Sequence, residues 1–280
     1  MKKRSIKPIR RIVIKIGSSS LTHKYTGLLN LGKVEKLTRI LCDLKNQGMD
    51  VVLVSSGAIA VGRQAVGFTS RPGTTAEKQA LAAIGQARLM MTYQKLFAEY
   101  NQNTAQVLLT RDTVLEEESR NNTINTFEEL FRMGVIPVVN ENDTVATHEI
   151  EFGDNDRLSA IVAALLKADM VILLSDIDGL YTSDPNLDPD AKRIPFVEDV
   201  DSVRESASEH SGSNVGTGGM VTKLMAAELA CESGASLVIA NGGDVDNITR
   251  ILDGEDVGTW FCEKREPGFD LLHYMKKEWL

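Results

Sequence analysis

Residues 11–17 have the sequence RIVIKIG, which is apolar at most positions, as in a parallel strand covered on both faces. Five later runs have the same character: VVLVSSG (51–57), TAQVLLT (104–110), VIPVVNEND (135–143), MVILLSDIDG (170–179) and SLVIANGG (236–243). Helical patterns separate them. In residues 31–47 leucine and valine recur at helical spacing, and Gly48 is placed to end the helix. This alternation predicts an α/β fold, a three-layer α/β/α sandwich with a mainly parallel central sheet.

The composition is that of a globular protein. The chain has 280 residues, of which 42% are hydrophobic and 25% charged. Because it contains no long linker, low-complexity tract or repeat, we expect a single domain over residues 1–280. Its apolar stretches are shorter than the roughly 20 residues that cross a bilayer, so we expect no membrane partner.

Charge and cysteine content narrow the possible partners and location. A formal net charge of −8 argues against nucleic acid as a partner, because phosphate backbones bind basic surfaces. The three cysteines form no CxxC pair, and an odd number suits a reducing compartment, so we expect a cytoplasmic protein. The four histidines lack the spacing of a metal site, and we assign no metal-binding residue.

Polar residues directly follow four of the apolar runs. They are Gly17–Ser20, Ser55–Gly57, Asn140–Asp143 and Ser175–Gly179. Each alone is an ordinary turn. Since ligands of such sheets bind beyond the carboxyl ends of the strands, the four together predict a ligand site there.

A glycine-rich stretch, GTGGMVTK (216–223), has the components of a phosphate-binding loop. Flexible backbone, hydroxyl groups and a lysine are what phosphate oxygens require. It is not a Walker A loop, because that motif closes with Gly-Lys-Ser/Thr after a longer spacing. The stretch therefore indicates a different class of nucleotide site.

Two lysines are candidates for holding a phosphoryl group. Lys15 lies near the end of the first apolar run, and Lys223 ends the glycine-rich stretch at the expected start of a helix. Solvent-facing positions are the alternative for both, since lysine is seldom buried without a partner. Two lysines that converge on one phosphoryl group repel each other, so a nearby carboxylate is expected. Asp156, in FGDNDRLSA (152–160), is the best placed.

Together these motifs resemble those of the glutamate 5-kinases, a branch of the amino acid kinase family. The resemblance extends over about residues 11–262 and is carried by VIKIGSSSL, VSSGAIAVG, VNENDTV, FGDNDRLSA, LLSDIDGLYTSDP and GTGGMVTKLMAA. It implies the amino acid kinase fold, in a short form without the C-terminal PUA domain that many relatives have.

The resemblance also implies the reaction, which is ATP-dependent phosphorylation of the side-chain carboxylate of L-glutamate, the first step of proline biosynthesis. Lys15 and Lys223 would stabilise the group in transfer, and Asp156 would orient both lysines. Ser55, Asp143 and Asn155 would hold glutamate. ATP, with Mg²⁺ on its phosphates, would be held by Lys15, Ser175, Asp176, Thr217, Gly218, Gly219, Met220, Val221, Thr222 and Lys223. Proline is implied as a feedback inhibitor, and we expect a homo-oligomer.

A carboxylate acceptor needs no catalytic histidine, because its pKa of about 4.3 leaves it ionised at neutral pH. Two alternatives remain open. Another kinase of the same fold, acting on acetylglutamate or a nucleoside monophosphate, would need a basic or acyl-accepting pocket where this chain has Asp143 and Asn155. A non-catalytic ligand-sensing module is disfavoured by the presence of Lys15, Asp156 and Lys223 together.

Overall fold

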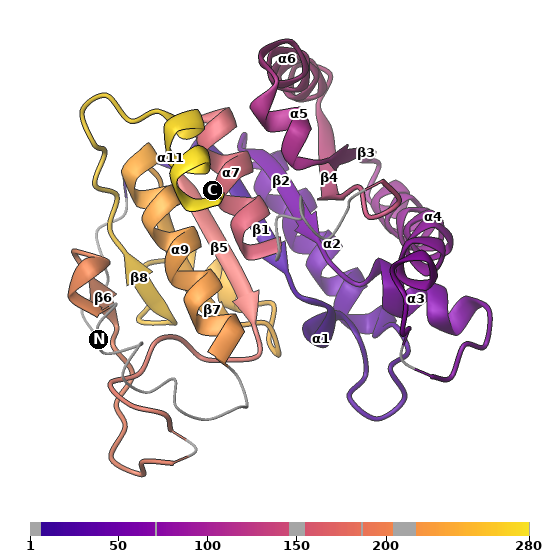
Figure 1. The fold of residues 1–280 in the computed structure, drawn as a ribbon, viewed down its shortest axis with the longest axis horizontal. Coiled ribbons are helices and arrows are strands. Elements are labelled where there is room, and N and C mark those ends of the chain that lie inside the picture. The colour runs from indigo at the N-terminus through magenta and orange to yellow at the C-terminus, as the bar shows by residue number, and fades with distance from the viewer. Residues whose placement is uncertain (1–6, 71, 146–154, 186, 204–216, 280) are drawn as a thin grey trace. The chain divides into compact units, whose positions relative to one another are not determined.

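The computed structural model describes residues 7–70, 72–145, 155–185, 187–203 and 217–279 (Figure 1). The chain divides into two compact units, one formed by Met1–Lys15 with Asp156–Leu280 and the other by Ile16–Asn155. A division of this kind does not test whether the chain folds as a single domain, and that expectation stays a prediction.

Three neighbouring parallel strands, in the order β3, β4, β2, form the sheet of the unit Ile16–Asn155. The strands are β2 (Asp50–Ser55), β3 (Asn103–Leu109) and β4 (Val135–Glu141). The helices are α1 (Ser18–Leu21), α2 (Leu31–Asn46), α3 (Ala58–Ala65), α4 (Thr75–Glu99), α5 (Arg111–Leu115) and α6 (Glu117–Arg132). Consecutive residues of β2 are fully buried, as the covered faces of a parallel strand require.

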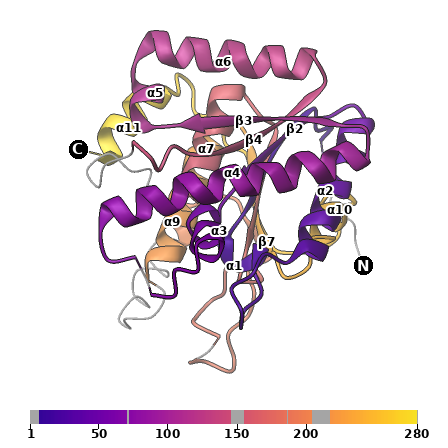
Figure 2. The same cartoon turned by 90° about the vertical axis from the view of Figure 1, so that its right-hand side faces the viewer.

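Glycines bring α3 against α4 (Figure 2). A Cβ atom at Gly62 would lie 1.9 Å from the carbonyl oxygen of Leu81, and one at Gly85 would lie 1.7 Å from that of Ala58. Neither position can hold a side chain while the helices keep this separation. Gly57, which precedes α3, has a φ of 106°, a backbone conformation that residues other than glycine rarely adopt. The glycines of SSGAIAVG therefore fix where α3 starts and how closely it packs.

The second unit has its strands in the order β1, β5, β7, β8, β6. The strands are β1 (Arg11–Ile16, with Ile16 assigned to the other unit), β5 (Met170–Ser175), β6 (Phe196–Val197), β7 (Ser236–Asn241) and β8 (Thr259–Phe261). β5 and β7 pair in parallel, and β8 is antiparallel to β7. The helices are α7 (Asn155–Leu166), α9 (Thr217–Ser233), α10 (Asn247–Leu252) and α11 (Leu271–Trp279).

The predicted α/β fold is confirmed, and each of the six predicted strands coincides with one of β1, β2, β3, β4, β5 and β7. α2 ends at Asn46, and Gly48 follows with a φ of 95°, so the predicted helix end is also correct. The two short strands β6 and β8 were not predicted. Across the described residues, no helix has both the length and the apolar character needed to cross a membrane.

Candidate active site

Three elements of one unit bring Lys15, Asp156 and Lys223 together. Lys15 comes from β1, Asp156 from the first turn of α7 and Lys223 from α9. The Nζ atom of Lys15 lies 2.5 Å from Oδ1 of Asp156, and Nζ of Lys223 lies 3.0 Å from Oδ2. The exposed fractions of the three residues are 5%, 0% and 6%. Neither lysine is a surface residue, so the solvent-facing alternative does not describe them.

The charges of this cluster keep Asp156 ionised. Burial raises the pKa of the Asp156 carboxyl, but the ammonium groups of Lys15 and Lys223 outweigh that effect, and the pKa lies below its ordinary value. One carboxylate thus lies between two buried ammonium groups, which leaves the cluster with a net positive charge. Such a cluster attracts a phosphoryl group, whose oxygens carry the complementary charge.

The position of Lys223 in its helix differs from the expectation. We predicted that Lys223 begins a helix after a glycine loop, but α9 begins at Thr217 and already includes Gly218 and Gly219. Within this helix the Nζ of Lys223 donates to the carbonyl oxygen of Gly219, four residues earlier, at 3.0 Å. Thr222 Oγ1 donates to the same oxygen. The two glycines therefore lie within the helix, although each disfavours a helix interior by roughly 1 kcal/mol.

The other residues predicted to hold ATP belong to the same unit. Ser175 ends β5, and its hydroxyl donates to Oδ1 of Asp176 at 3.0 Å. Met220, Val221 and Thr222 lie on the early turns of α9, where Val221 is exposed. Thr217 and Gly218 are described only as the first residues of that helix, while Gly216 and residues 152–154 of the predicted motifs lie outside the described residues.

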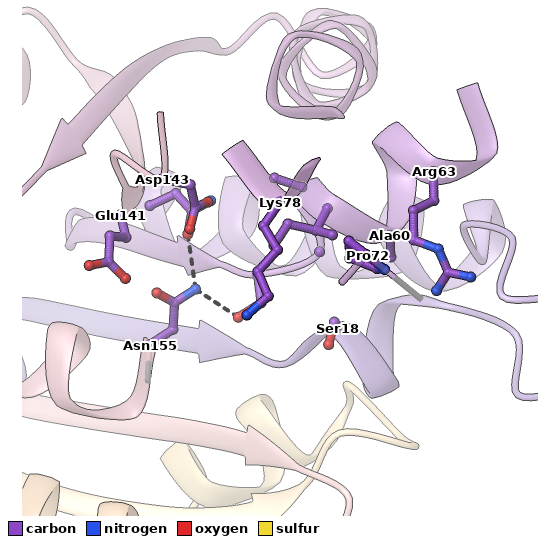
Figure 3. Close-up of a pocket in the computed structure, with 13 residues that line it drawn as sticks. Ser18, Ala60, Arg63, Pro72, Lys78, Glu141, Asp143 and Asn155 are labelled. Carbon is purple, nitrogen blue, oxygen red and sulfur yellow. Dashed lines mark hydrogen bonds between the residues drawn. The ribbon is translucent and has the colours of Figure 1, made fainter. Parts of the chain in front are cut away.

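A cavity of about 480 Å³ lies in the unit Ile16–Asn155, within the usual range of small-molecule sites (Figure 3). The first turn of α3 contributes Ala58, Ile59 and Ala60, and a first turn directs backbone N–H groups away from its helix. The polar side chains that line it are those of Ser18, Ser56, Arg63, Lys78, Asn140, Glu141, Asp143 and Asn155. Both signs of charge are present, so the cavity suits a ligand that carries both.

Two of the three residues predicted to hold glutamate line this cavity. Asp143 follows β4, and Asn155 is the first residue of α7. The amide nitrogen of Asn155 donates to the hydroxyl of Ser56 at 2.7 Å and to Oδ1 of Asn140 at 3.0 Å. Asn155 is therefore held in place by its neighbours.

Ser55, the third predicted residue, is not among the residues that line the cavity. Its exposed fraction is 1%, and its hydroxyl pairs with that of Tyr93 on α4 at 2.9 Å. Burial raises the pKa of Tyr93 to about 12, although the bond to Ser55 lowers it, so the phenol stays protonated at neutral pH. The structure thus brings Ser56 to the cavity wall, and a role for Ser55 in holding glutamate stays a prediction.

Sequence reasoning missed the two cations of the cavity, Arg63 and Lys78. Figure 3 shows Arg63 at the end away from Asp143 and Asn155, with Lys78 between the two ends. Nη2 of Arg63 donates to the carbonyl oxygen of Thr69 at 3.0 Å. Among the described residues, the buried Nε of Arg63 has no hydrogen-bond partner. The only available signal was that Arg63 directly follows the SSGAIAVG motif.

Comparison with known proteins identifies the family. The amino acid kinase family matches residues 10–241, which is most of the chain. The chain belongs to the amino acid kinase family. In this amino acid kinase, the matched segment includes all three residues of the lysine–aspartate cluster and every residue that lines the cavity.

Three similar sequences are named glutamate 5-kinase. A glutamate 5-kinase of Clostridium perfringens is 48% identical over 267 residues, covering 94% of this chain and 99% of the relative. One from Carboxydothermus hydrogenoformans is 49% identical, covering 98% and 72%. One from Clostridium acetobutylicum is 51% identical, covering 92% and 96%.

Solved structures with the same fold are more distant in sequence. Isopentenyl phosphate kinase from T. acidophilum superposes with a TM-score of 0.63 at 18% identity, covering 90% of this chain and 99% of its own. UMP kinase from Bacillus anthracis gives a TM-score of 0.61 at 16% identity, covering 92% and 98%. At this identity the likeness establishes the fold alone.

Proposed function

We propose that this amino acid kinase transfers the γ-phosphoryl group of ATP to the side-chain carboxylate of L-glutamate. A carboxylate oxygen forms a bond to the γ-phosphorus while the bond from that phosphorus to the β,γ-bridging oxygen breaks. The products are L-glutamate 5-phosphate and ADP. The acceptor is ionised at neutral pH, so no base is required.

The observation that carries the proposed reaction is the buried cluster of Lys15, Asp156 and Lys223. In phosphoryl transfer the protein contributes mainly positioning and neutralisation of charge. Two ammonium groups that one carboxylate holds in place provide both the positioning and the positive charge. They need not move during the reaction. We assign to Lys15 and Lys223 the stabilisation of the group in transfer, and to Asp156 their orientation.

The choice of glutamate is supported by the cavity and by the relatives. Asp143 and Asn155 offer oxygen atoms to an α-ammonium group, while Lys78 and Arg63 offer positive charge to a carboxylate. Relatives that are about half identical over most of the chain are named glutamate 5-kinase. The carboxylates of Glu141 and Asp143 favour an acceptor that also carries a positive charge, because opposite charges attract.

We assign the nucleotide to the unit that contains the lysine cluster, on Ser175, Asp176 and the early turns of α9. Among the described residues, no group of three or more histidine, cysteine, aspartate or glutamate side chains is arranged to hold a metal ion. We assign Mg²⁺ to the nucleotide phosphates, whose charge it would neutralise. Asp176 is an exposed carboxylate in this region that could contribute a ligand.

The test of the proposed function is capture of the acyl phosphate by hydroxylamine. With ATP, Mg²⁺ and L-glutamate, the protein should form γ-glutamyl hydroxamate and ADP in equal amounts. UMP and N-acetylglutamate, assayed for ADP release in the same way, should give no more than the background measured without acceptor. Faster ADP release with either compound, or no hydroxamate with glutamate, would reject the assignment.

We expect proline to inhibit in competition with glutamate. Proline has an α-carboxylate and a secondary ammonium group, which the charged groups of the cavity can accept. Millimolar proline should raise the apparent KM for glutamate and change that for ATP little. N-acetylproline, which lacks the ammonium group, is the matched control and should not inhibit. Unchanged glutamate kinetics at high proline would contradict this expectation.

We also propose that residues 1–280 fold as a single domain, that the protein is cytoplasmic and that it assembles as a homo-oligomer. The location rests on the odd number of cysteines and the lack of a CxxC pair, which suit a reducing compartment. Sedimentation tests the oligomer, and a single cooperative unfolding transition would support one domain.

A further inference from the structure

The chain turns back on itself soon after β5, and two short stretches of it pair with each other. The backbone N–H of Ile194 donates to the carbonyl oxygen of Leu180 at 2.7 Å. Two residues further into the hairpin, the N–H of Thr182 donates to the carbonyl oxygen of Lys192 at 2.9 Å. The two stretches therefore pair as antiparallel neighbours, and they form the base of a hairpin.

A side chain from another strand completes this base. In a hydrogen-bonded antiparallel pair, two residues exchange both of their N–H···O bonds. Leu180 and Ile194 make one such bond directly, and the hydroxyl of Thr259 takes the place of the other. The N–H of Leu180 donates to Oγ1 of Thr259 at 2.7 Å, and that hydroxyl donates to the carbonyl oxygen of Ile194 at 2.6 Å. The direction of both bonds is fixed, because a backbone N–H can only donate and a carbonyl oxygen can only accept.

Thr259 is itself firmly held. Its exposed fraction is 0%, and it lies on β8, where it pairs with Ile239 of β7. The chain passes close to its hydroxyl at Gly179, which has a φ of 148° and where a Cβ atom would lie 2.6 Å from Oγ1 of Thr259. Thr259 therefore fixes the point at which residues 176–179, the turn that follows β5, end.

The beginning of this turn is fixed by β7. Ser175, the last residue of β5, pairs with Asn241 of β7. Nδ2 of Asn241 donates to Oδ1 of Asp178 at 2.6 Å. Asp176 lies between these contacts and is exposed. The turn thus presents Asp176 to solvent from a backbone that is held on both sides.

We propose that Thr259 is a positioning residue for the nucleotide. Its hydroxyl holds the turn that carries Asp176 in one conformation before ATP arrives. A turn that is already ordered need not lose conformational freedom when the ligand binds, so the binding is tighter. This inference rests on the proposed function, because that function assigns Ser175 and Asp176 to ATP.

The test compares Thr259→Val, Thr259→Ser and, as a matched control, Thr249→Val at an exposed position of α10. Valine has nearly the shape of threonine but no hydroxyl, so Leu180 and Ile194 lose this partner. The Kd for Mg·ATP, measured by equilibrium dialysis without an acceptor, should rise about tenfold or more in Thr259→Val, on the scale of lost buried hydrogen bonds. The KM for ATP should rise with it, while the KM for glutamate should stay unchanged. Thr259→Ser, which keeps the hydroxyl, and Thr249→Val should bind ATP as the wild type does.

A merely structural role for Thr259 predicts a different result. Thr259→Val would then lose melting temperature, while its folded fraction would bind ATP with the wild-type Kd, and that result would overturn the inference. If Thr259→Val does not fold, Thr259→Cys replaces it, because a thiol is a weaker donor and acceptor than the hydroxyl of Thr259→Ser. Equal Kd values for ATP in the cysteine and serine variants would also overturn the inference. Because the dialysis contains no acceptor, ATP binding without hydroxamate formation in the wild type would reject the proposed function separately.

Discussion

Lys223→Ala is expected to lower kcat for glutamate phosphorylation by about 100-fold or more, the scale on which loss of one preorganised charge-stabilising donor acts. Lys223 is buried, and its ammonium group is fixed by Asp156 Oδ2 at 3.0 Å and by the carbonyl oxygen of Gly219 at 3.0 Å. Because these partners hold the charge before ATP binds, its full effect is available in the transition state. The KM for glutamate should change far less than kcat.

The variant must be shown to fold, since removing one member of a buried ion pair can cost about 3–5 kcal/mol of stability. Asp156 keeps its contact with Lys15 at 2.5 Å, so we expect a smaller loss, measured as the free energy of unfolding in urea. Lys95→Met, at an exposed position of α4, is the matched control and should leave kcat unchanged. A folded Lys223→Ala variant with near-normal kcat would remove Lys223 from the mechanism.

The fold could be predicted from the sequence because parallel strands covered on both faces leave a strong signal. RIVIKIG and MVILLSDIDG are apolar on consecutive positions, and β1 and β5 are correspondingly buried. β8 carries no such signal, since it has only three residues, Thr259–Phe261, and is identified by its pairing with β7. The local pattern of apolar residues therefore predicts which strands are buried. It does not predict which short segments, distant in the sequence, pair with each other.

The lysine–aspartate cluster could be anticipated for a physical reason. Two lysines that converge on a phosphoryl group require a carboxylate, and the structure places Asp156 against both. The hydrogen bonds that connect Gln86, Asn140 and Asn155 behind the cavity left a weaker signal in the sequence. Gln86 occurs among Leu81, Ala82, Leu89 and Tyr93 on the buried face of α4, and a glutamine on an apolar face indicates a buried partner. The sequence does not identify the partner of Gln86, because that partner, Asn140, lies far along the chain.

Asp143→Ala is expected to lower kcat/KM for glutamate by about 30-fold or more, because loss of one member of a desolvated charge pair costs about 2–5 kcal/mol. Asp143 is half-buried and lines the cavity together with Asn155. The α-ammonium group of glutamate loses water on entering, and a carboxylate replaces part of that hydration. The KM for ATP should move much less, since the residues assigned to ATP lie on β5 and α9.

Glutarate separates recognition of the ammonium group from any general damage to the cavity. It has both carboxylates of glutamate and no ammonium group, so Asp143→Ala should change its kcat/KM little. Glu141→Gln is the matched control, because Glu141 is a second carboxylate that lines the same cavity. If Glu141→Gln has the larger effect on glutamate, Glu141 is the partner of the ammonium group. If Asp143→Ala lowers kcat/KM equally for glutamate and glutarate, the Asp143 side chain contributes to the shape of the cavity. It does not then bind the ammonium group that distinguishes an amino acid from a plain dicarboxylate.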